Sequence, residues 1–158
     1  MIGLESSRPG AGLWRPRARK ERRPRPGGAL LPLRVLLFGL AAPLLLRRRP
    51  ERFAAWLEKA TAGAVRYEPR TAEELAHRVD VWLRAGWPLI RRGCLTRGAA
   101  QLYFLRRAGF PVSLRFGIGE VEDRLDGHCW LVLEGEPFAE KRDPRSIYTE
   151  TWRIPREE

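Results

Sequence analysis

Two cysteines and two histidines are the residues of this 158-residue chain best suited to nucleophilic chemistry. Cys94 follows Gly93 at the point where a helical pattern begins, so its thiol is expected beside unpaired backbone N–H groups. The positive end of a helix and a nearby imidazole both lower the pKa of a thiol. The same N–H groups can receive the oxyanion of a tetrahedral intermediate. Cys94 is therefore the candidate nucleophile.

The imidazole is expected from His128, which begins a strongly apolar strand pattern after that helix. The other histidine, His77, falls on the polar side of an earlier predicted helix. A lone cysteine or a lone strand histidine is usually a core residue. Their order along the chain, with an acidic residue following, favours a Cys-His-acid triad in which the acid orients the ring.

Three carboxylates compete for the third position of the triad. A tight turn is expected to fold the segment 138–140 back opposite the start of the preceding strand, which brings Glu140 within reach of His128. Asp143 is the alternative acid, and Asp126 is a weaker one. The sequence leaves the choice between Glu140 and Asp143 open.

Cys129 directly follows the candidate base. Because successive strand residues point to opposite faces, Cys129 is expected to face away from Cys94 and to be a core residue if His128 faces Cys94. Two cysteines and one well-placed histidine also lack the paired spacing of a structural zinc site. We therefore expect no metal and no other cofactor.

Four helices are expected between residue 30 and residue 107, and the last of them begins at the candidate nucleophile. Helices are predicted over 30–47 with a break at Pro43, from Pro50 to about Gly63, from 71 to about 86, and over 94–107. Thr71 and Glu74 have the spacing of a capping box at the start of the third helix.

The apolar period changes after residue 111. Strands are predicted over 112–118, 128–133, 137–140 and 148–154, with a charged loop over 119–127. Helices that precede an antiparallel sheet are typical of the α+β class. We expect N-terminal helices followed by a central helix that packs on a small antiparallel sheet.

The net charge of +11 is unevenly distributed, with +6 on residues 1–28, which are rich in Pro, Gly and Arg. This stretch is interpreted as a disordered extension, followed by a helical segment over 29–70 and a catalytic core over 71–158. No nucleic acid is expected as a partner, because the basic residues are concentrated in that extension without a recognised binding motif.

The run 29–46 is long and apolar, but it contains Arg34 and two prolines and falls short of a spanning helix. It is interpreted as a buried or membrane-surface helix, with possible peripheral membrane contact. Two cysteines do not make a disulfide framework in a chain of this length. The expected location is therefore the cytoplasm, with or without membrane association.

Four short segments stand out by their order and intervals, namely 94–99 (CLTRGA), 105–111 (LRRAGFP), 127–130 (GHCW) and 134–137 (EGEP). Together they resemble the transglutaminase-like leader peptidases of lasso-peptide biosynthesis, and the resemblance covers about residues 75–150. The resemblance implies a transglutaminase-like or papain-like core. By position it implies Cys94 as nucleophile, His128 as base and Glu140 as acid, where the family usually has aspartate. Cys129 stands where alanine is usual.

The resemblance also implies a function, which is removal of the leader from a ribosomally made precursor peptide. It implies a separate leader-recognition protein and an ATP-dependent cyclase as partners. Two other hypotheses remain open from the sequence. The same triad can serve an acyltransferase or an amidase with another acceptor, or the fold can act as a catalytically silent scaffold or binding module.

Overall fold

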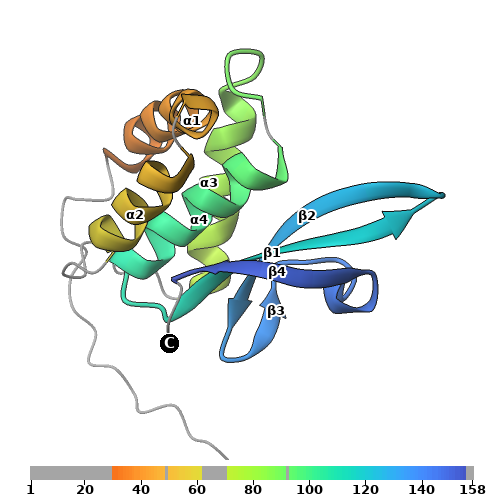
Figure 1. Cartoon of the computed structure of the whole chain (residues 1–158). Coiled ribbons are helices and arrows are strands. Elements are labelled where there is room, and N and C mark those ends of the chain that lie inside the picture. The colour runs from red at the N-terminus through yellow and green to blue at the C-terminus, as the bar shows by residue number, and fades with distance from the viewer. Residues whose placement is uncertain (1–29, 49, 62–70, 92, 156–158) are drawn as a thin grey trace, which may run out of the picture.

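The computed structural model describes residues 30–48, 50–61, 71–91 and 93–155. In order, its elements are α1 (Leu31–Arg48), α2 (Pro50–Thr61), α3 (Ala72–Ala85), α4 (Cys94–Arg107), β1 (Val112–Val121), β2 (Arg124–Leu133), β3 (Glu136–Phe138), the short 3₁₀ helix η2 (Pro144–Ser146) and β4 (Tyr148–Ile154). The helices gather on one side of the molecule and the antiparallel sheet lies beside α4 (Figure 1). The α+β prediction is confirmed.

The predicted helix boundaries are largely confirmed. Thr71 Oγ1 accepts a hydrogen bond from the Glu74 N–H at 3.1 Å, so the cap of α3 forms as expected. The predicted break at Pro43 is wrong, because α1 continues through this residue to Arg48. Proline removes one helix hydrogen bond, and the packing of α1 against α3 and α4 offsets that loss. The end predicted for the second helix, Gly63, lies outside the described residues.

The charged loop predicted over 119–127 is wrong, because β1 and β2 form one long hairpin through this region. Their pairing runs from Val112 opposite Leu133 to Val121 opposite Arg124. Glu122 and Asp123 make the turn, with φ angles of 52° and 60°. The hairpin extends beyond the helices (Figure 1) and both of its faces are exposed near the tip. The apolar alternation that indicates a strand is therefore missing there.

The strands pair in the order β3-β2-β1-β4. The turn was expected to place the segment 138–140 opposite Trp130 and His128, and this register is wrong by one residue and too long. Leu131 lies opposite Phe138, and the pairing between β2 and β3 ends there. A left-handed backbone at Ala139, with φ of 59°, turns the chain away from the sheet. Glu140 is therefore placed by an irregular segment after β3 rather than by strand pairing.

Helix α4 is the centre of the core. The side chains of Ala99, Leu102, Phe104 and Leu105 have no exposed surface. Helices α1, α2 and α3 contact α4, and strands β1 and β2 contact it as well. Because α4 is enclosed on these sides, its first residue is held in a fixed position relative to the sheet.

Two predictions concern the first half of the chain. None of the helices in the described ranges combines the length and apolarity needed to cross a membrane. The proposed boundaries after residues 28 and 70 both adjoin residues that the structure does not describe, so the division into extension, helical segment and core stays a prediction.

Gly117 in β1 tests how closely β4 and the Trp130 ring pack on this strand. A Cβ there would lie 2.9 Å from the Thr149 carbonyl oxygen and 2.9 Å from the Trp130 ring. We expect Gly117→Ala to lower the free energy of unfolding by about 1–3 kcal/mol, as measured by urea denaturation. Gly127→Ala is the matched control in the same hairpin, since a Cβ at Gly127 would meet no atom within 4 Å. Equal unfolding curves for the two variants would contradict the close packing at Gly117.

Candidate functional site

Cys94 is the first residue of α4. Its predecessor, Gly93, is the N-cap of the helix and makes no side-chain hydrogen bond to the helix end, and no acidic residue lies in the first turn. The first backbone N–H groups of α4 are therefore left free of a side-chain cap. The space beside Gly93 is open, since a Cβ there would meet no atom within 4 Å. The candidate nucleophile lies at an accessible and positively polarised helix end.

The surroundings of Cys94 lower the pKa of its thiol from 9.0 to about 5. The largest cause is a hydrogen bond with the thiol of Cys129, and partial burial acts against it. The backbone of Cys129, the charge of His128 and the backbone N–H of Leu95 stabilise the thiolate further. Cys94 is therefore ionised at neutral pH.

The expectation that Cys129 faces away from Cys94 is wrong. It is 5% exposed and belongs to the core, as expected. Its thiol nevertheless hydrogen-bonds with Cys94, and its Sγ lies 3.5 Å from the position of a Cβ on Gly98 of α4. Side chains do alternate along β2, but α4 covers the face that carries Cys129. The hydrogen bond with Cys94, together with burial, raises the pKa of Cys129, so this thiol remains protonated as a donor.

His128 is partly exposed near the middle of β2, and its Nε2 lies 3.8 Å from Glu140 Oε2. On one side it pairs with Gly117 of β1, whereas β3 pairs only with 131–133 and leaves the other side of His128 without a described strand neighbour. The ring reaches Glu140 at this open edge. Nε2 is therefore the ring nitrogen that the Glu140 carboxylate can orient.

Arg97 holds Glu140 in place, and sequence analysis did not single it out. Its Nη1 lies 3.5 Å from Glu140 Oε1, and its Nη2 donates to the carbonyl of Ala139 at 2.9 Å. On its other side, Arg97 Nε lies 3.6 Å from Asp80 of α3. Arg97 comes three residues after Cys94, so both lie on one helix face. That spacing was the available signal for its role.

The two alternative acids have other partners. Asp143 is exposed, caps η2 and accepts hydrogen bonds from the Arg145 backbone at 2.9 Å and from the Arg145 guanidinium at 2.8 Å. Arg145 also lowers the pKa of Asp143. Asp126 accepts a hydrogen bond from the hydroxyl of Tyr148 at 2.8 Å. Of the three carboxylates, the structure brings Glu140 to the His128 ring.

Two aromatic side chains pack beside the His128 ring. The centroid of Tyr148 in β4 lies 5.1 Å from it, and that of Trp130 lies 6.3 Å from it at an interplanar angle of 15°. Trp130 in turn packs on Gly117, where there is no side chain to displace it. These contacts restrict the orientation of the imidazole, and the two flanking rings were also missed by sequence analysis.

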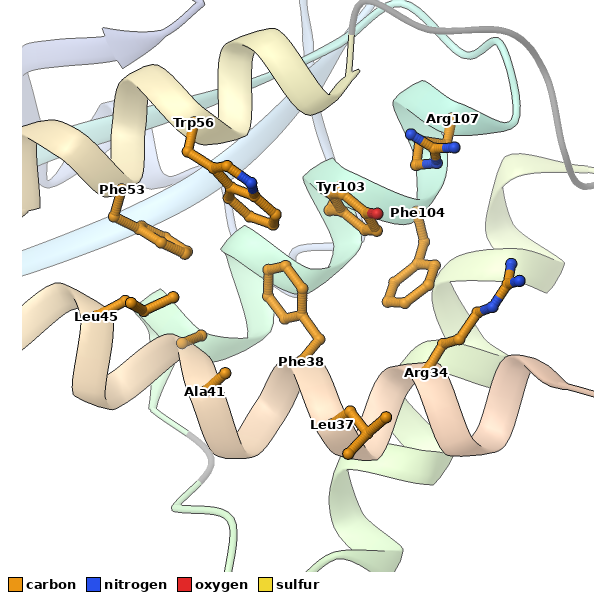
Figure 2. A pocket seen from close by; sticks show the side chains of 11 residues that line it. Arg34, Leu37, Phe38, Ala41, Leu45, Phe53, Trp56, Tyr103, Phe104 and Arg107 are labelled. Carbon is orange, nitrogen blue, oxygen red and sulfur yellow. The ribbon is translucent and has the colours of Figure 1, made fainter.

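A cavity of about 450 Å³ opens elsewhere, between α1, α2 and α4. Figure 2 shows its aromatic lining, with Phe38 pointing between Trp56 and Tyr103. Tyr103 follows Cys94 by nine residues of α4, which is about 14 Å along a helix axis. The cavity therefore lies apart from the candidate nucleophile. In the described part of the chain, no cluster of three His, Cys, Asp or Glu residues is placed to hold a metal ion.

The fold and the site together define a class. A thiolate at the start of a helix that packs on an antiparallel sheet, with a histidine on the sheet and a carboxylate behind it, is the arrangement of a cysteine-nucleophile α+β fold. The model of the Transglutaminase-like superfamily matches residues 36–153, and the chain belongs to that superfamily. The match includes Cys94, His128 and Glu140. Neither a curated protein nor a solved structure matches the chain.

The low pKa of Cys94 can be measured through its reaction with iodoacetamide, because only the thiolate reacts. We expect the alkylation rate of Cys94 in the folded protein to rise with pH around a midpoint of about 5. Cys129→Ala removes the thiol donor, so the midpoint moves up and the rate at about pH 6 falls on the order of tenfold.

Cys129→Ser is the matched control, since its hydroxyl can still donate to the thiolate. It should keep the midpoint closer to that of the unsubstituted protein, with mass spectrometry locating the label on Cys94. A midpoint that is the same in all three proteins would contradict the hydrogen bond from Cys129.

Proposed function

We propose that the protein is a cysteine peptidase that removes the leader from a ribosomally synthesised precursor peptide of the lasso type. The observation that carries the chemistry is the position of Cys94 at an open helix end, with its thiol pKa lowered to about 5, together with a histidine that lies against Glu140. The substrate class is supported by the resemblance of the segments around Cys94 and His128 to lasso-peptide leader peptidases. Membership of the Transglutaminase-like superfamily is compatible with both.

In the proposed reaction, the thiolate of Cys94 attacks the scissile carbonyl carbon of the precursor. The negative charge that develops on the carbonyl oxygen is stabilised by backbone N–H groups at the start of α4. His128 donates a proton to the leaving amine, and the C–N bond breaks. A water molecule, deprotonated by His128, then hydrolyses the thioester and restores the free thiolate.

The proposal includes two partners, a separate leader-recognition protein and an ATP-dependent cyclase that closes the ring after cleavage. The precursor would approach over Gly93, where the surface beside the nucleophile is open. Glu140 would orient His128 through Nε2, and Arg97 and Asp80 would keep the Glu140 carboxylate in position.

Cleavage of a lasso-type precursor in the presence of its leader-binding protein tests the proposal. We expect the unsubstituted protein to release the leader and Cys94→Ala to release none, with mass spectrometry as the readout. Cys129→Ser is a control that leaves the nucleophile in place. Continued cleavage by Cys94→Ala would overturn the mechanism, and failure of the unsubstituted protein to cut any such precursor would overturn the substrate class.

The identity of the acid gives a second test. We expect Glu140→Gln to lower kcat by on the order of 100-fold or more, because an amide cannot stabilise a positively charged imidazole as a carboxylate does. Asp143→Asn should leave kcat close to that of the unsubstituted protein, since Asp143 is engaged by Arg145 away from the ring. The reverse ranking of the two variants would show that Asp143 serves His128.

The same thioester can be transferred to an amine instead of water, which would make the protein an acyltransferase. Product mass distinguishes the two outcomes, because hydrolysis leaves a free carboxylate and transfer leaves a new amide. A protein whose Cys94 is not alkylated at neutral pH would instead fit a scaffold or binding module, and such a result would contradict both enzymatic functions.

A further inference from the structure

The side of α1 that faces away from the core carries a line of exposed leucines, here called the leucine stripe. Its members are spaced by three or four residues and are each 47–57% exposed: Leu30, which directly precedes α1, and Leu33, Leu37, Leu40 and Leu44 on one face of α1. The opposite face of α1 packs in the core through Leu31, Val35 and Ala42, which are at most 1% exposed. The helix is thus apolar on both sides. An exposed apolar patch such as the leucine stripe is typical of a site that binds a protein or a membrane.

Nearly all of the net charge of the chain falls in the part of the sequence that contains the leucine stripe and the residues before it. Residues 1–49 contain twelve basic and two acidic side chains, for a net charge of +10, whereas residues 50–158 carry only +1. Helix α1 itself contains no acidic residue. The partner of the leucine stripe is therefore expected to be anionic, and a second copy of this chain would bring two strongly basic segments together.

The cavity between α1, α2 and α4 adjoins the leucine stripe, because Leu37 belongs to both. Arg34 and Arg107 lie at the Phe104 end of the cavity, and Leu45 and Phe53 lie toward the other end (Figure 2). The cavity is thus lined by two guanidinium groups and by apolar side chains. It matches the chemistry of an anionic amphiphile, with a charged head and a hydrocarbon tail.

Two contacts fix the position of Arg107 beside the cavity. Its Nη1 donates to the carbonyl of Ala60 at 2.8 Å, and its guanidinium carbon lies 5.5 Å from the centre of the Tyr103 ring. Trp56 at the edge of the cavity is 45% exposed. Tryptophan beside basic and apolar side chains is typical of the headgroup region of a bilayer.

We propose that α1 docks on an anionic lipid bilayer, lying in its surface with the leucine stripe among the upper acyl chains and the arginines beside lipid phosphates. Apolar insertion and a polybasic segment are the two signals that stable peripheral binding needs. A bilayer is favoured over an acidic protein, because exposed leucines, basic residues and the half-exposed Trp56 together are the combination expected at the lipid headgroup region. This inference concerns the exposed face of α1 rather than the site at Cys94, and it does not rest on the proposed function.

Sedimentation with lipid vesicles tests the proposal in the full-length chain. We expect binding to vesicles of equal parts phosphatidylglycerol and phosphatidylcholine, and weak binding to phosphatidylcholine alone. The triple variant Leu33→Gln/Leu40→Gln/Leu44→Gln should lose on the order of 100-fold in affinity, because three apolar anchors are removed. The matched control is Leu89→Gln/Leu125→Gln, at positions that are 79% and 82% exposed and lie outside α1. The control should bind as the unsubstituted protein does.

Circular dichroism and thermal unfolding show whether the triple variant keeps its fold. If it does not, the single variants Leu33→Gln and Leu40→Gln replace it, each with a proportionally smaller expected loss. Unchanged affinity in a folded triple variant would overturn the proposal, since the basic residues alone would then account for binding. Absence of binding to anionic vesicles, or a self-association that the same substitutions abolish, would overturn it as well.

Discussion

The burial of α4 is the constraint on which the rest of the structure depends. Its central side chains are completely enclosed between three helices and the sheet, so the helix can neither slide nor rotate without opening voids in the core. This fixes Cys94, its first residue, against the middle of β2. A thiolate is thereby held at the positive end of a rigid helix, next to the backbone and thiol of Cys129 and within the electrostatic reach of His128. The position of the candidate nucleophile follows mainly from the packing of the helix that carries it.

A chain of charged groups extends this constraint to the candidate acid. Arg97 leaves α4 one turn after Cys94 and lies between Asp80 of α3 and Glu140 after β3. Because these groups are only partly exposed, their mutual attraction is less screened than that of surface pairs. Glu140 sits on an irregular segment that the strand ladder does not hold, and Arg97 supplies the attachment that the backbone lacks. The His128 ring is then held between this carboxylate and the rings of Trp130 and Tyr148.

The two ends of α4 have different surroundings and different proposed roles. At its first residue are the open helix end, the two thiols and the histidine, which suit covalent chemistry on a carbonyl group. At its last turn, Arg107 borders a cavity that α1 also lines, and α1 belongs to the strongly basic part of the sequence.

The sequence by itself determined the class of the fold, the cap of α3, the bounds of α4 and the identity of the candidate nucleophile and base. Each of these follows from local periodicity, capping residues or helix-end chemistry, which are properties of neighbouring residues. Only the tertiary structure decided the rest. The hairpin tip was read as a loop because neither of its faces is buried, and the register of β3 depended on a turn at 134–135 whose backbone is left-handed. Cys129 was set aside because alternation along a strand separates two faces without saying which face a helix will cover. Which thiol meets Cys94, and which carboxylate meets His128, are facts about packing between distant segments, and the sequence pattern of one segment does not contain them.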